Sequence, residues 1–132
     1  MNQRKYINVL TTISVREREY IMLVKKIEEA RKNVQERSEV LKNKIQTCGF
    51  LTEKSREQLF SLLENSIALF ELNVNSVEKD MDRFHKLFPG KEEDERFFKA
   101  LSETIDCALK SFELDEEIIN DSLKLERVSG WR

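Results

Sequence analysis

Apolar residues recur along the chain at alternating spacings of three and four, and the longest unbroken run lies between residues 60 and 88. Its members are Phe60, Leu63, Ile67, Phe70, Val74, Val77, Met81, Phe84 and Phe88. Such a heptad seam is typical of a helix that packs lengthwise against other helices. A second row of leucines widens this apolar face, as a helix with two neighbours requires. That row consists of Leu59, Leu62, Leu69 and Leu72. The pattern predicts that residues 53–88 form the central helix of a bundle.

The same alternation precedes this central segment and predicts a long helix that ends at residue 48. Two starting points fit the sequence. The helix begins near residue 3, or a short helix over residues 3–12 is followed by a kink and a long helix from about residue 15. The kink is suggested by β-branched residues around Thr12 and by the capping-box pattern of Ser14 with Glu17. Arg31 and Ser38 occupy seam positions, where they either set the register or leave gaps in the core.

A third seam predicts a helix over residues 92–127. Its members are Phe98, Leu101, Ile105, Ala108, Phe112, Asp115, Ile119 and Ser122. Gly49 is expected to stop the first helix in the left-handed conformation, Thr52 or Ser55 to start the second, and Pro89-Gly90 to end it. Short connections imply antiparallel neighbours. The sequence therefore predicts an all-α, up-down-up antiparallel three-helix coiled-coil bundle, one domain over residues 1–128 with a tail at 129–132.

Charge is graded along the chain. Residues 1–48 hold 11 Lys/Arg and 6 Asp/Glu (net +5), residues 49–90 hold 5 and 7 (net −2), and residues 91–132 hold 7 and 12 (net −5). Opposite charge favours packing of the first helix against the third. The alternative is that the basic helix presents its face to an acidic partner.

Few residues in this chain are candidates for catalysis or metal binding. The two cysteines, Cys48 and Cys107, form no metal-binding spacing, and the predicted topology separates them by roughly 30 Å, outside disulfide reach. Cys107 is predicted to face the core. The single histidine, His85, follows Glu78 and Asp82 on one helix face, but a metal site in a bundle needs further inward ligands. We therefore expect no enzymatic activity, no metal, no cofactor and no nucleic-acid binding.

Some apolar residues lie outside the heptad seams, so the packing of the seams does not account for them. Residues 20–24 are apolar all round the helix, so either both flanks are covered inside the bundle or part of this girdle is a partner or oligomer surface. Trp131, in the tail, is a further candidate for recognition. The predicted partner-binding residues are Tyr20, Ile21, Met22, Leu23, Leu62, Leu69, Leu72 and Trp131.

These features indicate a non-enzymatic protein–protein interaction module: an adaptor, a scaffold or a chaperone-like helical subunit, with self-association as a homodimer left open. No window approaches the ~18 apolar residues of a membrane span, and the cysteine usage fits a reducing compartment, so a cytoplasmic location is expected. One alternative is a secretion-system partner or cargo chaperone. Another is a peripheral membrane protein that uses residues 3–16, a basic amphipathic stretch without acidic residues.

Overall fold

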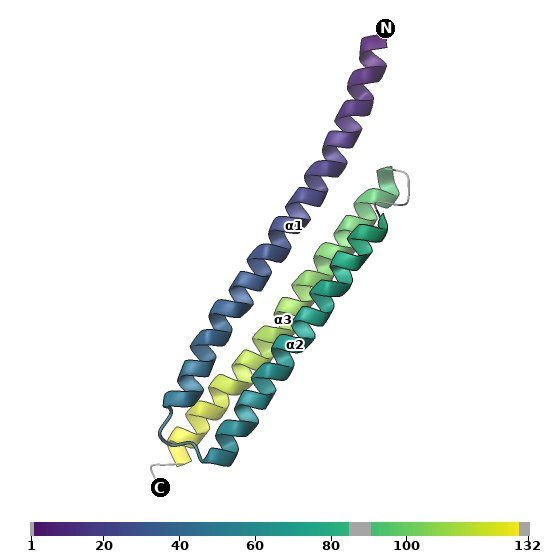
Figure 1. Ribbon diagram of the computed structural model, residues 1–132. Coiled ribbons are helices and arrows are strands. Elements are labelled where there is room, and N and C mark those ends of the chain that lie inside the picture. Colours follow the sequence, from purple (N-terminus) through teal and green to yellow (C-terminus); the bar gives the residue numbers. More distant parts are fainter. Residues whose placement is uncertain (1, 85–90, 130–132) are drawn as a thin grey trace.

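The protein folds as a bundle of three long helices. The computed structural model describes the backbone of residues 2–84 and 91–129, and within these ranges the side chains of residues 17–84 and 94–124. The described part contains α1 (Asn2–Thr47), α2 (Glu53–Phe84) and α3 (Lys91–Ser129). They run up, down and up, with all three pairs in contact (Figure 1). The predicted all-α three-helix bundle is confirmed.

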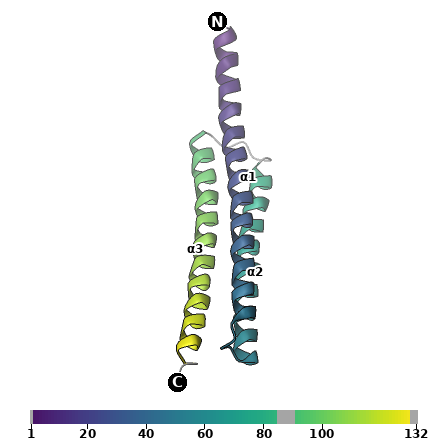
Figure 2. The ribbon, with the colours of Figure 1, turned by 90° about the vertical axis from the view of Figure 1, so that its left-hand side faces the viewer.

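α1 is a single continuous helix of 46 residues. The predicted alternative, a separate short helix over residues 3–12 followed by a kink, is therefore wrong. Its N-terminal part projects beyond the ends of α2 and α3 in both side views (Figures 1 and 2). The end predicted for the second helix, at Pro89-Gly90, lies outside the described residues, as do His85 and Trp131. α3 extends two residues past the predicted end at 127.

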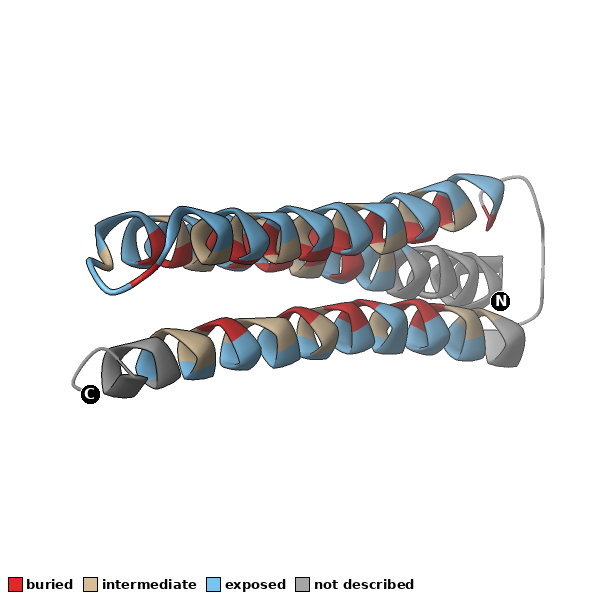
Figure 3. Cartoon of the chain, turned by 90° about the horizontal axis from the view of Figure 1, so that it is seen from below, coloured by how far each residue is buried: buried red, intermediate tan, exposed pale blue. Residues whose placement is uncertain are grey.

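Buried side chains form one stripe on each helix, and the three stripes face one another (Figure 3). On α3 the buried apolar residues belong to the predicted seam: Phe98, Leu101, Ile105, Ala108, Phe112 and Ile119. The most completely buried large side chains include Phe70, Phe112, Leu41, Ile45 and Leu63. The core therefore runs the length of the bundle as a continuous column.

On α1 and α2 the core stripe is displaced by one residue from parts of the predicted seams. Leu59 and Ser66 are buried, whereas Phe60 and Ile67 are half-buried at the flank. On α1, Ala30 enters the core in place of Arg31. The displacement arises because consecutive helix positions differ by only about 100°. A helix with two neighbours can therefore direct either of two adjacent positions inward.

The first connection is held by hydrogen bonds at both helix ends. The Ser55 N–H donates to Thr52 Oγ1 at 3.1 Å, so Thr52 is the N-cap of α2. At the end of α1, the Arg56 guanidinium donates to the carbonyl oxygens of Ile45 (3.0 Å), Gln46 and Cys48 (3.2 Å). The prediction of a left-handed Gly49 is wrong, because no glycine in the described part has a positive φ. Arg56 satisfies the helix end instead.

Ser38 places a polar side chain in the otherwise apolar core of α1. Its side chain is buried, and its Oγ has no hydrogen-bond partner. A buried hydroxyl without a partner costs free energy, and alanine also has the higher helix propensity. We expect Ser38→Ala to raise the free energy of unfolding by about 1 kcal/mol. Urea unfolding followed by circular dichroism would measure this change.

The reciprocal change is the control for Ser38. Ala108 is a small residue buried to a similar degree on α3. Ala108→Ser adds a hydroxyl to the same core and is expected to lower the free energy of unfolding. If Ser38→Ala proves destabilising, its hydroxyl has a partner in solution and the assignment fails.

Candidate interaction surface

Ion pairs join α1 and α3 along the border between these two helices. Lys26 Nζ lies 2.8 Å from Asp106 Oδ1, and it donates to Ser102 Oγ at 2.6 Å. About three turns further along, Arg37 pairs with Glu113 at 3.2 Å and with Glu116 at 3.8 Å. In these pairs the cation comes from α1 and the acid from α3, as the charge gradient predicts. The contact of Lys26 with Asp106 also places Cys107 level with residue 27 of α1, in agreement with the predicted separation of Cys107 from Cys48.

The border between α1 and α2 is closed in the same way, by Arg31. Its guanidinium donates to Glu78 Oε1 and to Asn75 Oδ1 (3.0 Å), and its Nε lies 3.4 Å from Glu71 Oε2. The hydrogen bond with Glu78 raises the pKa of Arg31, partial burial lowers it, and the charge of Glu71 raises it further, with a net upward shift. These contacts show that Glu71 and Glu78 lie on the side of α2 that faces α1.

The border between α2 and α3 differs from the other two. Between residues 58–76 of α2 and residues 100–118 of α3, no ion pair joins the helices. Of residues 58–77, only Glu64 and Glu71 are charged. Glu71 faces α1, and Glu64 lies seven residues before it on the same side of the helix. The side of α2 directed away from α1 is therefore uncharged.

Ring contacts show which side of α3 meets α2. Phe97 stacks on Phe84 of α2, with 4.3 Å between ring centroids. Seven-residue steps from Phe97 along the same side of α3 reach Thr104, Ser111 and Ile118. On α2, Leu62, Leu69 and Ser76 lie about 160° around the helix from the acids that face α1. The row of α2 that contains Leu69 and the row of α3 that contains Ile118 therefore lie next to each other on one side of the bundle.

The apolar side chains on this side are exposed. Leu69 is 48% exposed, Leu72 65%, Leu114 61% and Ile118 52%, while Leu62 is half-buried. Solvent-exposed leucines that gather on neighbouring helices are typical of a surface that binds another protein. We name this surface the uncharged face. It comprises Leu62, Asn65, Leu69, Leu72 and Ser76 of α2 and Ala100, Thr104, Cys107, Ser111, Leu114 and Ile118 of α3.

The four predicted partner-binding residues of α1 separate into different environments. Ile21 and Met22 are 52% and 59% exposed. Tyr20 is half-buried against the core. Leu23 is only 4% exposed and belongs to the core, so its prediction as a surface residue is corrected. Its spacing of four from Ile27 places it on the inward stripe.

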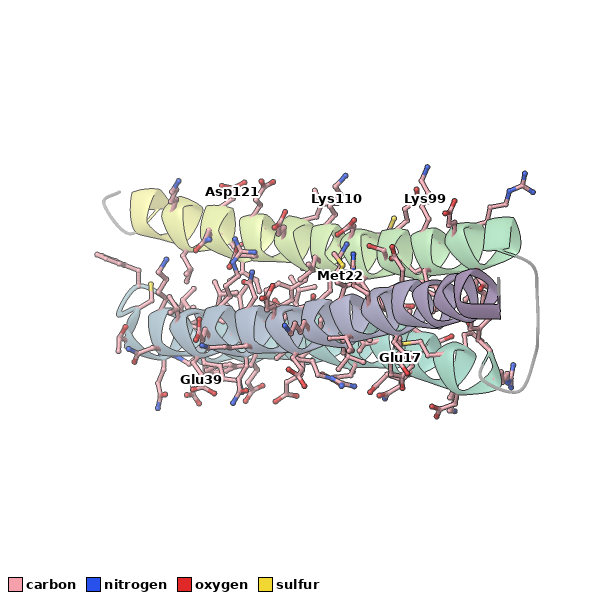
Figure 4. All side chains as sticks on the ribbon, turned by 90° about the horizontal axis from the view of Figure 1, so that it is seen from above. Glu17, Met22, Glu39, Lys99, Lys110 and Asp121 are labelled. Atoms are coloured by element: carbon pink, nitrogen blue, oxygen red, sulfur yellow. The ribbon has the colours of Figure 1, made fainter. Side chains whose placement is uncertain are left out.

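Met22 lies away from the uncharged face. Its side chain points toward α3 (Figure 4) and lines a small cleft of about 250 Å³ on the α1–α3 border. That cleft also contains Leu23, Lys26 and Phe98. The predicted residues of α1 and α2 therefore do not form one surface.

Sequence reasoning missed Leu114 and Ile118. A signal was present, because α3 carries a second alternation of four and three made of uncharged residues: Ala100, Thr104, Cys107, Ser111, Leu114 and Ile118. The acidic run that surrounds Leu114 concealed it. Cys107 belongs to this row and is exposed, so the prediction that it faces the core is wrong.

No group of three or more His, Cys, Asp or Glu side chains in the described part of the chain could hold a metal ion. Cys48 and Cys107 are both free thiols. A cleft of about 670 Å³ at the end of the bundle is lined by residues that include Lys44, Cys48, Phe50 and Lys124. Within the described residues, its lining contains no histidine or carboxylate beside the thiol.

Comparisons with known proteins give no family for this chain: no family model, no curated protein and no solved structure matches it. Within the described residues, no helix is both long enough and apolar enough to cross a membrane.

Proposed function

We propose that the protein is a non-enzymatic protein–protein interaction module, a cytoplasmic adaptor or scaffold that binds a helical partner on the uncharged face. The observation that supports this proposal most strongly is the contrast between the three helix borders. Two are closed by ion pairs of Lys26, Arg31 and Arg37, while the third exposes leucines and an isoleucine without charge.

A helix is the partner that this surface fits best. The exposed rows of α2 and α3 run parallel to the bundle axis, and each keeps the three–four spacing of a heptad seam. A further helix laid along both rows would bury its own seam and complete a four-helix arrangement. No residue of either row is charged, so a partner that contacts these rows alone meets little ionic desolvation cost.

We expect the double variant Leu69→Asp/Leu114→Asp to lose partner binding, by about 30-fold or more in affinity, because two carboxylates would have to be buried in an apolar contact. The measurement is affinity capture with a tagged chain, followed by mass spectrometry and by titration of the captured protein. Both side chains are about half exposed or more, so the variant is expected to keep its helicity.

Val40→Asp is the matched control. Val40 is 54% exposed on α1, outside the uncharged face, so this variant introduces the same charge at a similar exposure elsewhere. Capture that is equal for the wild type, the control and the double variant would contradict the proposed function. Unfolding of the double variant would show instead that Leu69 and Leu114 contribute to the core.

A further inference from the structure

We propose that the cleft at the end of the bundle, where α1 ends beside the C-terminal part of α3 (Figure 1), binds a free fatty acid. We name this site the end cleft. Its volume of about 670 Å³ lies within the range of about 300–1,000 Å³ that is typical of small-molecule sites. The residues that carry the proposal are Lys44, Cys48, Phe50, Asn120, Leu123 and Lys124. The end cleft is separate from the uncharged face, so this inference does not depend on the proposed function.

The pairing of cations with acids along the α1–α3 border stops at the end cleft. Nearer the middle of the bundle, Lys26 lies 2.8 Å from Asp106, and Arg37 pairs with two glutamates of α3. A step of seven residues from Arg37 along the same side of α1 reaches Lys44. The charged residue that lines the end cleft from α3 is Lys124 instead of an acid. Two lysines from different helices therefore line one cleft.

Among the described residues, neither lysine of the end cleft has an acidic partner. Lys44 and Lys124 form none of the ion pairs in that part of the chain, and no carboxylate lines the cleft there. The end of α1 does not require Lys44 as a donor, because Arg56 donates to three of its carbonyl oxygens. Two ammonium groups without an acid give the cleft a positive potential, which favours an anion that contacts both.

The end cleft also offers apolar surface to a ligand. Phe50, in the first connection, is 47% exposed, and Leu123 of α3 lines the same cleft while packing against the core. An alkyl chain laid over this ring and this leucine would remove apolar area from water, which is favourable. Asn120 adds an amide N–H donor for the anionic group. One anionic group joined to an apolar chain, as in a fatty acid, therefore matches both parts of the lining.

The two cysteines provide a direct test of where the ligand binds. Cys48 lines the end cleft, Cys107 belongs to the uncharged face, and both are free thiols. Decanoate bound in the end cleft would cover the Cys48 thiol and leave the Cys107 thiol accessible. We expect saturating decanoate, below its micelle concentration, to slow alkylation of Cys48 by iodoacetamide by about tenfold or more. Alkylation of Cys107 is expected to stay unchanged, and mass spectrometry of the two peptides measures both rates.

Matched probes separate the anionic group from the apolar chain. Decan-1-ol carries the chain without the charge, and acetate carries the carboxylate without the chain. We expect each of them to protect Cys48 much less than decanoate does at the same concentration, because each satisfies only one part of the lining. Vesicles that contain phosphatidylglycerol test the other source of an anionic lipid. Protection of Cys48 by such vesicles, but not by decanoate, would assign the site to a membrane surface and contradict the proposal.

Charge reversal tests the two lysines. The double variant Lys44→Glu/Lys124→Glu is expected to weaken decanoate binding by about 30-fold or more, because two attractions to the carboxylate become repulsions. Isothermal titration calorimetry of the full chain measures the affinity. The matched control is Lys25→Glu/Lys110→Glu, which changes the net charge equally on the same two helices at exposed positions outside the end cleft. We expect this control to bind decanoate as the wild type does, and circular dichroism verifies that both variants stay helical.

Three results would overturn this inference. They are equal effects of decanoate on Cys48 and Cys107, protection by decan-1-ol as strong as that by decanoate, and decanoate binding that survives reversal of both lysines. If the variant with both lysines reversed fails to fold, alkylation of the wild-type chain with the three probes still decides, because it needs no substitution. None of these results bears on partner capture through Leu69 and Leu114, so the proposed function is tested separately.

Discussion

Replacing Phe112 with alanine is expected to lower the free energy of unfolding by about 3–5 kcal/mol. Phe112 is 1% exposed on α3 and belongs to the column of buried side chains that all three helices share. Removing the ring takes away its transfer free energy and leaves a cavity that long, straight helices cannot collapse to fill. Urea denaturation at one fixed protein concentration would measure the loss, since any self-association makes stability depend on concentration.

Leu114→Ala is the control for this prediction. Leu114 lies two residues away on the same helix, with the same local propensity, but it is 61% exposed. Its replacement is expected to change the unfolding free energy of the isolated bundle by less than about 0.5 kcal/mol. A loss of less than about 1.5 kcal/mol for Phe112→Ala would mean that the core is loosely packed at this level.

Replacing Arg56 with alanine is expected to lower the free energy of unfolding by about 2 kcal/mol. One guanidinium satisfies the carbonyl oxygens of Ile45, Gln46 and Cys48, the last turn of α1, from the first turn of α2. Without it, these acceptors lose charge-assisted hydrogen bonds and the favourable interaction of a cation with the end of the helix dipole. Thermal and urea unfolding of the full chain would both report the change.

Arg56→Lys separates charge from geometry. The ammonium keeps the cation near the end of α1, but it lacks the planar fork that reaches several carbonyls at once. We expect Arg56→Lys to recover part of the loss, with stability between that of the wild type and that of Arg56→Ala. If Arg56→Ala is as stable as the wild type, water replaces the guanidinium at no cost, and the first connection does not depend on this residue.

The two sets of substitutions separate folding from binding. Phe112 lies in the core and Arg56 in the first turn of α2, and we expect their replacement to affect the unfolding free energy. Leu69, Leu72 and Leu114 lie on the uncharged face, and we expect aspartate there to affect association while helicity is retained. This separation is possible because α2 and α3 each carry a buried row and an exposed apolar row on different sides of the helix.

Much of the architecture was predictable from the sequence because heptad spacing and scarce turn residues are local properties. The seams located the three helices, the short connections indicated the up-down-up order, and the charge gradient predicted the ion pairs of α1 with α3, such as Lys26 with Asp106. The register of α1 with α3 also followed, since helix lengths and loop positions fix it.

Other features depended on contacts between residues far apart in the chain. Spacing alone did not decide between Ala30 and Arg31, or between Leu59 and Phe60, because adjacent positions on a wide apolar face differ by only about 100°. The acids Glu71 and Glu78 hold Arg31 outside the core, and they lie 40 and 47 residues after it in the sequence. The capping of α1 by Arg56 was likewise invisible locally, because a side chain of the next helix supplies it.

The uncharged face shows most clearly which features the sequence determines and which features depend on packing between helices. The sequence by itself determined three amphipathic helices and the leucines of α2, including Leu69 and Leu72. Only the tertiary structure decided that the outward row of α3, with Leu114 and Ile118, lies beside them. The physical reason is that periodicity defines which residues share a face of one helix, whereas the neighbour of that face is set by packing between helices.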